Sequence, residues 1–353
     1  MSLASYLEAA PKAELHVHLE GSILPNILLA LAKRNGVLLP TETEVGLREW
    51  FHFSDFLHFI EVYIAITRCL RDEEDYEYIA YEFGKEMARQ NIRYAEVTFS
   101  PSTHHRLGIP FDIYFTGLCR GRDKARAEFG VDFNFVFDIV RNYDDASLCH
   151  ELADYTTSVA IDGKDYGVIA LGLGGLEAGY PAQPFAGYFK RALAAGLHST
   201  PHSGETDGPQ SIWASLGELQ AERLGHGVRA IEDPELVRHL AHNKIPLEIN
   251  PTSNICLRVY PSYAEHPFRR LYEAGVIVTV NSDDPPLFNT TLNQEVALLA
   301  DTFHLDVDAI DEILLNGVRH SFLSAERKKS LETSFRSDLA RLKKVHLNGN
   351  EAR

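Results

Sequence analysis

The stretch that decides the fold is Pro11-Lys-Ala-Glu-Leu-His-Val-His-Leu-Glu-Gly21, near the start of the 353-residue chain. If this stretch forms a strand, His16 and His18 point to the same side, because side chains alternate along a strand. Three further motifs follow in order: His202-Ser-Gly-Glu205, Gly225-His-Gly227 and Asn281-Ser-Asp-Asp-Pro285. A third histidine and a carboxylate would complete a shell of four nitrogen and oxygen ligands, which suits zinc at a hydrolytic site.

Short apolar runs alternate with longer amphipathic segments along nearly the whole chain, which is typical of repeated βα units. We expect helices such as 76–90, 185–195, 209–219 and 233–242. We expect eight strands, at 14–19, 92–99, 133–140, 168–174, 199–203, 223–227, 246–250 and 276–281. Eight parallel strands predict an α/β fold of the TIM-barrel type, (β/α)8. An open doubly wound sheet would need a Gly-rich phosphate turn after the first strand, and Gly21-Ser22 is not one.

The chain is expected to form one domain over 1–353, because no linker-like stretch divides it. The connection between the first two strands, 22–91, is too long for one helix and contains an aromatic segment at 44–70. Such a connection lies at the catalytic face of a barrel, so we predict a helical lid insertion there. The segment 324–353 is charged and lacks a continuous apolar stripe, which predicts a solvated terminal helix with a frayed end.

Composition restricts the kinds of partner. The formal net charge of -16 argues against a nucleic-acid or anionic-membrane surface, since such surfaces need clustered lysine and arginine. No run of 18 apolar residues is present, and residues 1–13 do not resemble an export signal. The four cysteines form no Cys-x-x-Cys pair, which indicates reduced thiols. We therefore expect a cytoplasmic protein that acts on a small molecule, and the sequence leaves the oligomeric state open.

The polar candidates all fall at the carboxyl ends of predicted strands, which is the rim where such barrels carry their active sites. They are His16, His18, His202, His226, Asp283 and Asp284. The two adjacent aspartates point in different directions, so one can bind a metal while the other faces the substrate. Glu205 lies just past its strand and suits a general acid or base better than a metal ligand. A helix-start glutamate favoured by the helix dipole is the plain structural alternative.

A binuclear hydrolase is the alternative chemistry. It would need a bridging carboxylate or modified lysine near the end of the strand 168–174. The sequence there is Leu171-Gly-Leu-Gly-Gly-Leu-Glu177, with no lysine and a glutamate only beyond the glycines. One metal per chain is therefore the prediction, with iron as the alternative to zinc.

From Pro11 to Pro285, these motifs resemble those of adenosine deaminases of the amidohydrolase superfamily. The resemblance implies a distorted barrel with one catalytic Zn²⁺ held by His16, His18, His202 and Asp283. It implies that Glu205 delivers a proton to purine N1 and that His226 orients and helps activate the attacking water. It also implies that Asp284 is the acceptor that recognises purine N7 and that Gly175 donates its backbone N–H to N3.

The substrate-binding residues are expected to be His18, Gly175 and Asp284 around the base. Glu20, Phe56 and the segment 172–180 are expected beyond the ribose. Many adenosine-specific members carry aspartate at the position of Glu20, and their Leu-Ala-Gly-Asp-Glu is Leu173-Gly-Gly-Leu-Glu177 here. The latter segment is similar to bacterial relatives that act on aminodeoxyfutalosine, an adenosine analogue of the menaquinone pathway with a bulky 5′ extension.

Four functions are therefore compared. The first is a deaminase of adenosine or a 5′-modified adenosine, and the second is specifically an aminodeoxyfutalosine deaminase. The third is an adenine deaminase, which is the weakest substrate candidate because adenine-specific relatives tend to carry Ser-Ser-Glu at this segment. The fourth is a barrel that binds a nucleoside without catalysis, and the intact set of ligands, Glu205 and His226 argues against it.

Overall fold

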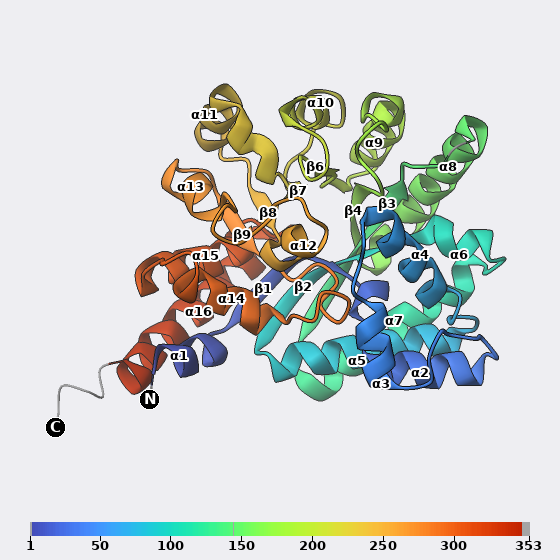
Figure 1. Ribbon diagram of the computed structural model, residues 1–353, viewed down its shortest axis with the longest axis horizontal. Coiled ribbons are helices and arrows are strands. Elements are labelled where there is room, and N and C mark those ends of the chain that lie inside the picture. The colour runs from blue at the N-terminus through green and yellow to red at the C-terminus, as the bar shows by residue number, and fades with distance from the viewer. Residues whose placement is uncertain (1, 144, 348–353) are drawn as a thin grey trace.

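The strands run parallel in two sheets at the centre of the molecule (Figure 1). The computed structural model describes residues 2–143 and 145–347. One sheet has the order β1 (Lys12–His18), β2 (Ile92–Phe99), β3 (Asp132–Val140), β4 (Val168–Gly174) and β5 (His198–Ser199). The other has the order β6 (His202–Ser203), β7 (Leu224–His226), β8 (Leu247–Ile249) and β9 (Val278–Val280). Each predicted strand is found, and the predicted α/β fold of the TIM-barrel type is confirmed.

The predicted strand 199–203 is divided into β5 and β6. Pro201 lies at the division and has no backbone N–H to donate to a neighbouring strand. The segment still connects the two sheets, because the Thr200 amide donates to the Leu171 carbonyl (3.1 Å) and the Gly225 amide donates to the Pro201 carbonyl (2.9 Å). The division is therefore a change of partner from β4 to β7.

The other edges of the two sheets are joined by a short parallel bridge between Val17 and Asp283. The His18 amide donates to the Asp283 carbonyl at 2.8 Å, and the Asp283 amide donates to the His16 carbonyl at 3.3 Å. Two residues before Asp283, the side-chain oxygen of Asn281 accepts a hydrogen bond from the Leu15 amide at 2.9 Å. The segment after β9 is thus fixed against β1.

Most of the helices surround the strands (Figure 1). Those predicted at 76–90, 185–195, 209–219 and 233–242 are found as α5 (Glu73–Arg89), α9 (Ala186–Ala194), α10 (Pro209–Glu218) and α11 (Pro234–Asn243). The remaining helices are α1 (Leu3–Ala9), α2 (Pro25–Arg34), α3 (Glu44–Trp50), α4 (Phe56–Thr67), α6 (Pro101–Arg106), α7 (Phe111–Phe129), α8 (Ala146–Asp162), α12 (Pro251–Cys256), α13 (Phe268–Glu273), α14 (Leu292–Asp301), α15 (Val307–Arg319) and α16 (Ala325–His346).

The hydrophobic core lies between the strands and these helices. Phe135 and Phe137, two apart along β3, both contact Phe115 of α7. Because side chains alternate along a strand, Asp138 of β3 points to the opposite side, and it lines the central cavity. In β3 this alternation places the phenylalanines toward α7, and Asp138 and Val140 toward the cavity.

The long connection between β1 and β2 contains α2, α3, α4 and α5. Helix α5 packs closely on α7, and only glycine fits at positions 117 and 121 of α7. A β-carbon at either position would collide with the backbone carbonyl of Glu73 or Glu77. Helix α4 instead lines the central cavity through Phe56 and its neighbours. The predicted insertion 22–91 therefore includes one helix of the outer layer, and its action as a lid stays a prediction.

Helix α16 corrects one expectation about the C-terminal segment. A terminal helix is present, but it is not simply solvated, because Phe335, Leu339 and Leu342 are buried along one face. The spacing of four and three residues puts these side chains on the same stripe of a helix. The charged composition hides this short stripe. The predicted frayed end at 348–353 lies outside the described residues.

Two expectations from composition concern membranes and thiols. Within residues 2–143 and 145–347, none of the helices combines the length and the apolar character that a bilayer span requires. The cysteines at positions 69, 119, 149 and 256 are all free thiols.

Candidate active site

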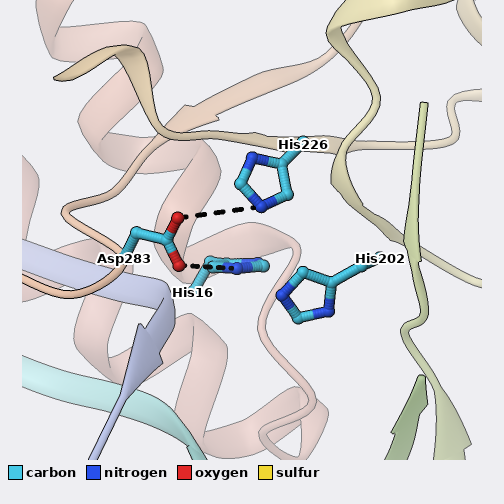
Figure 2. A group of neighbouring side chains, drawn as sticks. All are labelled: His16, His202, His226 and Asp283. Carbon is cyan, nitrogen blue, oxygen red and sulfur yellow. Dashed lines mark ion pairs between the residues drawn. The ribbon is translucent and has the colours of Figure 1, made fainter. Parts of the chain in front are cut away.

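Side chains from distant parts of the chain meet at the carboxyl ends of the strands. Three imidazoles and a carboxylate point toward one another, with ligand atoms within 4.8 Å: His16, His202, His226 and Asp283 (Figure 2). They come from β1, β6, β7 and the segment after β9. His18 joins the same cluster through a second group that contains Asp283 and Asp284. The structure thus brings together all the histidines and aspartates that the sequence predicted for the site.

The spacing of the predicted ligand atoms fits a divalent metal. The Nε2 atom of His18 lies 3.2 Å from His202 Nε2 and 3.3 Å from Asp283 Oδ1, and His16 Nε2 lies 3.4 Å from the same oxygen. Ligands about 2.0–2.1 Å from a tetrahedral zinc are separated by about 3.3 Å. The buried His16 Nε2 has no hydrogen-bond partner among the described residues, which would be costly unless a cation binds there.

The charges around two of the imidazoles also suit a metal. Burial and the neighbouring imidazoles of His16 and His18 hold the pKa of His202 well below its ordinary value, so His202 presents a lone pair. Burial opposes a charge on His16, but the carboxylates of Asp283 and Glu248 outweigh it and raise the pKa of His16 to about 10. The same negative charges would stabilise a divalent cation in place of that proton.

His226 is placed differently from the other imidazoles. Its Nδ1 atom lies 3.3 Å from the amide nitrogen of Asn250 and 3.2 Å from that of Asn254. Burial lowers the pKa of His226 to about 3, so the ring is neutral. If Nδ1 accepts from the amides, Nε2 carries the proton and cannot bind a metal. This Nε2 faces Asp283 Oδ2 at 3.7 Å and Glu205 Oε1 at 3.8 Å, where an N–H donor can orient a bound molecule.

Two of these residues have backbone conformations that are uncommon for residues other than glycine. The φ angles are +60° for His226 and +63° for Asp283, both in the left-handed region. Such conformations cost on the order of 1–3 kcal/mol each and tend to occur at functional sites. Here both residues follow or end a strand, and this conformation directs the side chains of His226 and Asp283 into the cluster.

His16 is held by a buried chain of charges that the sequence interpretation missed. Its Nδ1 atom lies 2.9 Å from Glu248 Oε2, and the other oxygen of Glu248 accepts from Arg223 Nε at 2.6 Å. Arg223 also donates to Glu96 at 2.5 Å. Burial alone would raise the pKa of Glu248, but Arg223 and His16 lower it to about 2. A charged Glu248 accepts a hydrogen bond from the Nδ1–H of His16 and so directs Nε2 toward the cluster.

The loop that carries Glu205 is held by Glu177. One oxygen of Glu177 accepts from the Gly204 amide at 2.6 Å, and the other accepts from the amides of Glu205, Thr206 and Asp207 at 2.9, 3.0 and 3.0 Å. The Ser211 hydroxyl donates to the first oxygen. These bonds use the lone pairs that a bridging metal ligand would need, which disfavours the binuclear alternative.

Glu205 itself is buried and lines the cavity beside His226. Burial raises the pKa of Glu205 to about 8, and the nearby carboxylates of Asp283 and Glu177 add to the effect. A carboxyl with this pKa holds its proton at neutral pH. The arrangement therefore suits a general acid, as the sequence predicts.

Asp284 lines the cavity next to the candidate metal ligands, and its Oδ1 atom has no hydrogen-bond partner among the described residues. Burial raises the pKa of Asp284 well above its ordinary value, with the charge of Asp283 adding to it. We revise the expected role of acceptor, because a neutral carboxyl offers a donor and purine N7 offers only a lone pair. A β-carbon at Gly21 would collide with this carboxyl, which explains the glycine in the first motif.

A cavity of about 580 Å³ opens from the cluster, a size that suits a small-molecule ligand. Among the predicted substrate contacts, His18, Gly175, Asp284 and Phe56 line it. The sequence interpretation missed further lining residues, including Tyr63, Arg68, Ser100, Arg106, Asp138 and Tyr143. Their positions depend on how α4, α6 and β3 come together, which no local motif specifies.

Glu20 is the exception among the predicted contacts, because it is not part of the cavity surface. Its Oε1 atom accepts from the Ser100 amide at 3.1 Å and lies 3.1 Å from His104 Nε2. The short 3₁₀ turn Glu20–Ser22 follows β1, and it buries this side chain against Ser100 after β2 and His104 of α6. The expectation that Glu20 forms part of the wall beyond the ribose is therefore corrected.

Known proteins with similar sequence or structure fall into one group. A family profile described as adenosine deaminase matches residues 11–336. The chain is 44% identical to the aminodeoxyfutalosine deaminase of Streptomyces avermitilis, covering 92% of this chain and 90% of the relative. It is 35% identical to the adenine deaminase of Cupriavidus necator, covering 93% and 92%. The crystal structure of an adenine deaminase from Arthrobacter aurescens has a TM-score of 0.87 and 30% identity, covering 94% of this chain and 100% of that one.

The fold and the buried histidine and aspartate cluster define a hydrolase with a metal-dependent amidohydrolase fold. The chain belongs to the adenosine deaminase family and is a hydrolytic deaminase. The resemblance predicted from the four motifs is thereby confirmed.

The buried contact between His16 and Glu248 leads to a prediction about metal affinity. Glu248→Gln should weaken Zn²⁺ binding by about 10–100-fold, because an amide neither neutralises the cation nor holds the His16 ring as firmly. Competition with a chelator measures the affinity, and circular dichroism of the metal-free variant reports whether it is folded. Glu265→Gln, an exposed glutamate outside the cavity, is the matched control. Unchanged affinity in a folded Glu248→Gln protein would contradict the proposed support of His16.

Proposed function

We propose that this protein is a zinc-dependent hydrolytic deaminase of a 6-aminopurine nucleoside with a 5′ extension, and that aminodeoxyfutalosine is its substrate. The observation that carries the proposal is one cavity that joins the metal cluster and Glu205 to a wall formed by α4 and α6. The 44% identity to aminodeoxyfutalosine deaminase exceeds the 35% identity to adenine deaminase, which favours the extended nucleoside.

In this proposal a single Zn²⁺ per chain is held by His16, His18, His202 and Asp283. When bound, zinc supplies a Lewis acid that makes water nucleophilic near neutral pH. The three imidazoles and one carboxylate match the preferred donors of zinc, and Glu248 keeps His16 oriented toward them.

The protein groups then divide the remaining work. Asp284, in its neutral form, donates to purine N7 and orients the base, and the backbone N–H of Gly175 donates to N3. His226 orients the attacking oxygen with its Nε2–H. As the new C–O bond forms at C6, Glu205 delivers its proton to N1. The C6–N bond then breaks: one proton of the attacking water leaves with the amine as ammonia, the other restores the Glu205 carboxyl, and the 6-oxo purine remains.

Adenosine and adenine are the alternative substrates. Adenine has support from relatives named adenine deaminase at 35–37% identity. Adenine would fill only part of the cavity, whereas a nucleoside with a substituent on its 5′ side would also reach α4 and α6. A barrel that binds without catalysis has no need for an acid with a raised pKa beside a metal cluster, so we do not favour it.

Glu205 leads to a prediction about pH dependence. The acid is active only when protonated, so kcat/KM should fall as the pH rises through its pKa. Burial raises that pKa to about 8 in the absence of a cation, and a bound cation would lower it, so the fall should be centred at or below about pH 8. Glu205→Gln should keep the metal, remove this alkaline limb and lower kcat at least about 100-fold.

The matched control is Glu218→Gln, an exposed glutamate at the end of α10. It should retain the wild-type pH profile. Near-normal turnover by Glu205→Gln with full metal content would remove Glu205 from the mechanism.

The substrate proposal is tested by comparing kcat/KM for aminodeoxyfutalosine, adenosine and adenine with the metal-loaded protein. We expect aminodeoxyfutalosine to exceed adenosine by more than about tenfold, because contacts beyond the ribose contribute binding energy in the transition state. Adenine should be the poorest substrate. Equal or better turnover of adenosine would contradict the extended substrate while leaving the deaminase chemistry in place.

A further inference from the structure

The charges that line the active-site cavity are separated in space. Its buried end carries Asp138, Glu205, Asp283 and Asp284, whereas the exposed residues Arg68 and Arg106 line the same cavity at its mouth. Arg68 ends helix α4, and Arg106 is the last residue of α6. These two helices contact each other, so both arginines belong to one side of the opening.

Within residues 2–143 and 145–347, no carboxylate forms an ion pair with the guanidinium of Arg68 or Arg106. Arg106 instead lies over the ring of Tyr143, 5.0 Å from its centroid, and Tyr143 also lines the cavity. A helix end favours a cation through the helix dipole, but this does not explain why both cations line the cavity. In a chain with a net charge of -16, two arginines that line one opening and have no carboxylate partner among the described residues form a local site for an anion.

We propose that Arg68 and Arg106 form a subsite for an anionic group, a carboxylate or a phosphate, at the end of the substrate opposite the purine. This inference rests on the proposed function, because it assumes that the base lies at Glu205 and Asp284. A guanidinium binds either anion with two parallel hydrogen bonds. The ring of Tyr143 holds Arg106 in place and adds an apolar surface for the linking group.

The test compares an anionic and a neutral member of two substrate pairs, and the first pair is also matched in size. One pair is a 5′-thioadenosine derivative ending in a carboxylate and its primary amide, and the other pair is 5′-AMP and adenosine. The wild-type protein should prefer the anionic member of at least one pair by more than about tenfold in kcat/KM. Preference in the first pair identifies a carboxylate, and preference in the second identifies a phosphate. Raising the ionic strength should reduce the preference.

Arg68→Met and Arg106→Met keep the length of the side chain but remove its charge. Each should reduce the preference for the anion, and the double variant should abolish it. Arg71→Met is the control, because Arg71 is exposed, lies three residues further on and does not line the cavity. A preference that survives the double variant, or no preference in the wild-type protein, would overturn the subsite.

Calorimetric binding of the corresponding 6-oxo probes separates this proposal from the proposed function. Charge-dependent binding that is lost in the double variant supports the subsite even if no probe is deaminated. Deamination of the probes without charge dependence supports the function and overturns the subsite.

A second, independent inference concerns the orientation of His226. The backbone amide of Phe268 donates to His266 Nδ1 at 3.2 Å, so the proton of the neutral His266 ring is on Nε2. His266 Nε2 donates to Asn254 Oδ1 at 3.0 Å, which fixes the Asn254 amide so that its nitrogen faces His226 Nδ1 at 3.2 Å. Asn250 is held less firmly, because its amide nitrogen donates only a long hydrogen bond to the Glu248 carbonyl (3.3 Å) and its Oδ1 atom has no partner among the described residues.

We infer that Asn254 and His266 are positioning residues that fix the tautomer of His226. The chain of hydrogen bonds starts at the backbone N–H of Phe268, which can only donate. Each hydrogen bond then determines which atom of the next side chain donates and which accepts. The relay therefore ends with a proton on His226 Nε2, facing Glu205 and Asp283. Neither residue touches the substrate cavity.

The test is ¹⁵N NMR of labelled histidines in the metal-loaded protein. The wild-type His226 should carry its proton on Nε2. In Asn254→Asp the new carboxylate accepts only, so a proton should appear on Nδ1, and kcat should fall at least tenfold while KM changes little. Asn243→Asp, an exposed change of the same kind on α11, should alter neither. An unchanged His226 signal in Asn254→Asp would overturn the inference.

If Asn254→Asp does not fold, His266→Phe provides the same test, because it keeps Asn254 and an aromatic ring. It should lower kcat and change the His226 nitrogen shifts. Wild-type values for both would overturn the relay.

Discussion

The bridge between Val17 and Asp283 is the contact on which the rest of the structure depends. It ties the segment after the last strand to the first strand, and its hydrogen bonds involve the backbone of His16, His18 and Asp283. The same pairing therefore completes the arrangement of strands and sets the separation of the candidate metal ligands. A one-residue slip would turn the histidines to the opposite face of the strand, so fold and site are fixed by one register.

Much of this arrangement is predictable from the sequence, because its causes are local. The alternation in β1 puts His16 and His18 on one side. Because barrel active sites lie at the carboxyl ends of the strands, the remaining motifs are predicted to lie beside them. Glu248 and Asn254 escaped prediction because their partners lie far along the chain. A charged residue within the apolar run Leu247-Glu248-Ile249 was the available indication, since an inward-facing glutamate in a strand needs a buried partner.

The errors have equally specific causes. The turn after β1 directs Glu20 into the protein, where Ser100 and His104 take up its carboxylate, and that turn is not visible in the spacing of the motif. In α16, three buried side chains suffice to dock a helix whose composition is otherwise charged. In both cases a tertiary contact from a remote segment decided where the side chain went.

The four backbone amides that converge on Glu177 have a consequence for how this scaffold diverges in evolution. They tie the loop of Glu205 to the end of β4, on the part of the barrel built from β4 and β6. A second wall of the cavity is supplied by α4 and α6, which share none of these bonds. Changes in the two helices therefore leave the position of Glu205 undisturbed. Selection can exchange one substrate for another while the chemistry is inherited intact, in keeping with relatives of similar sequence that carry different substrate names.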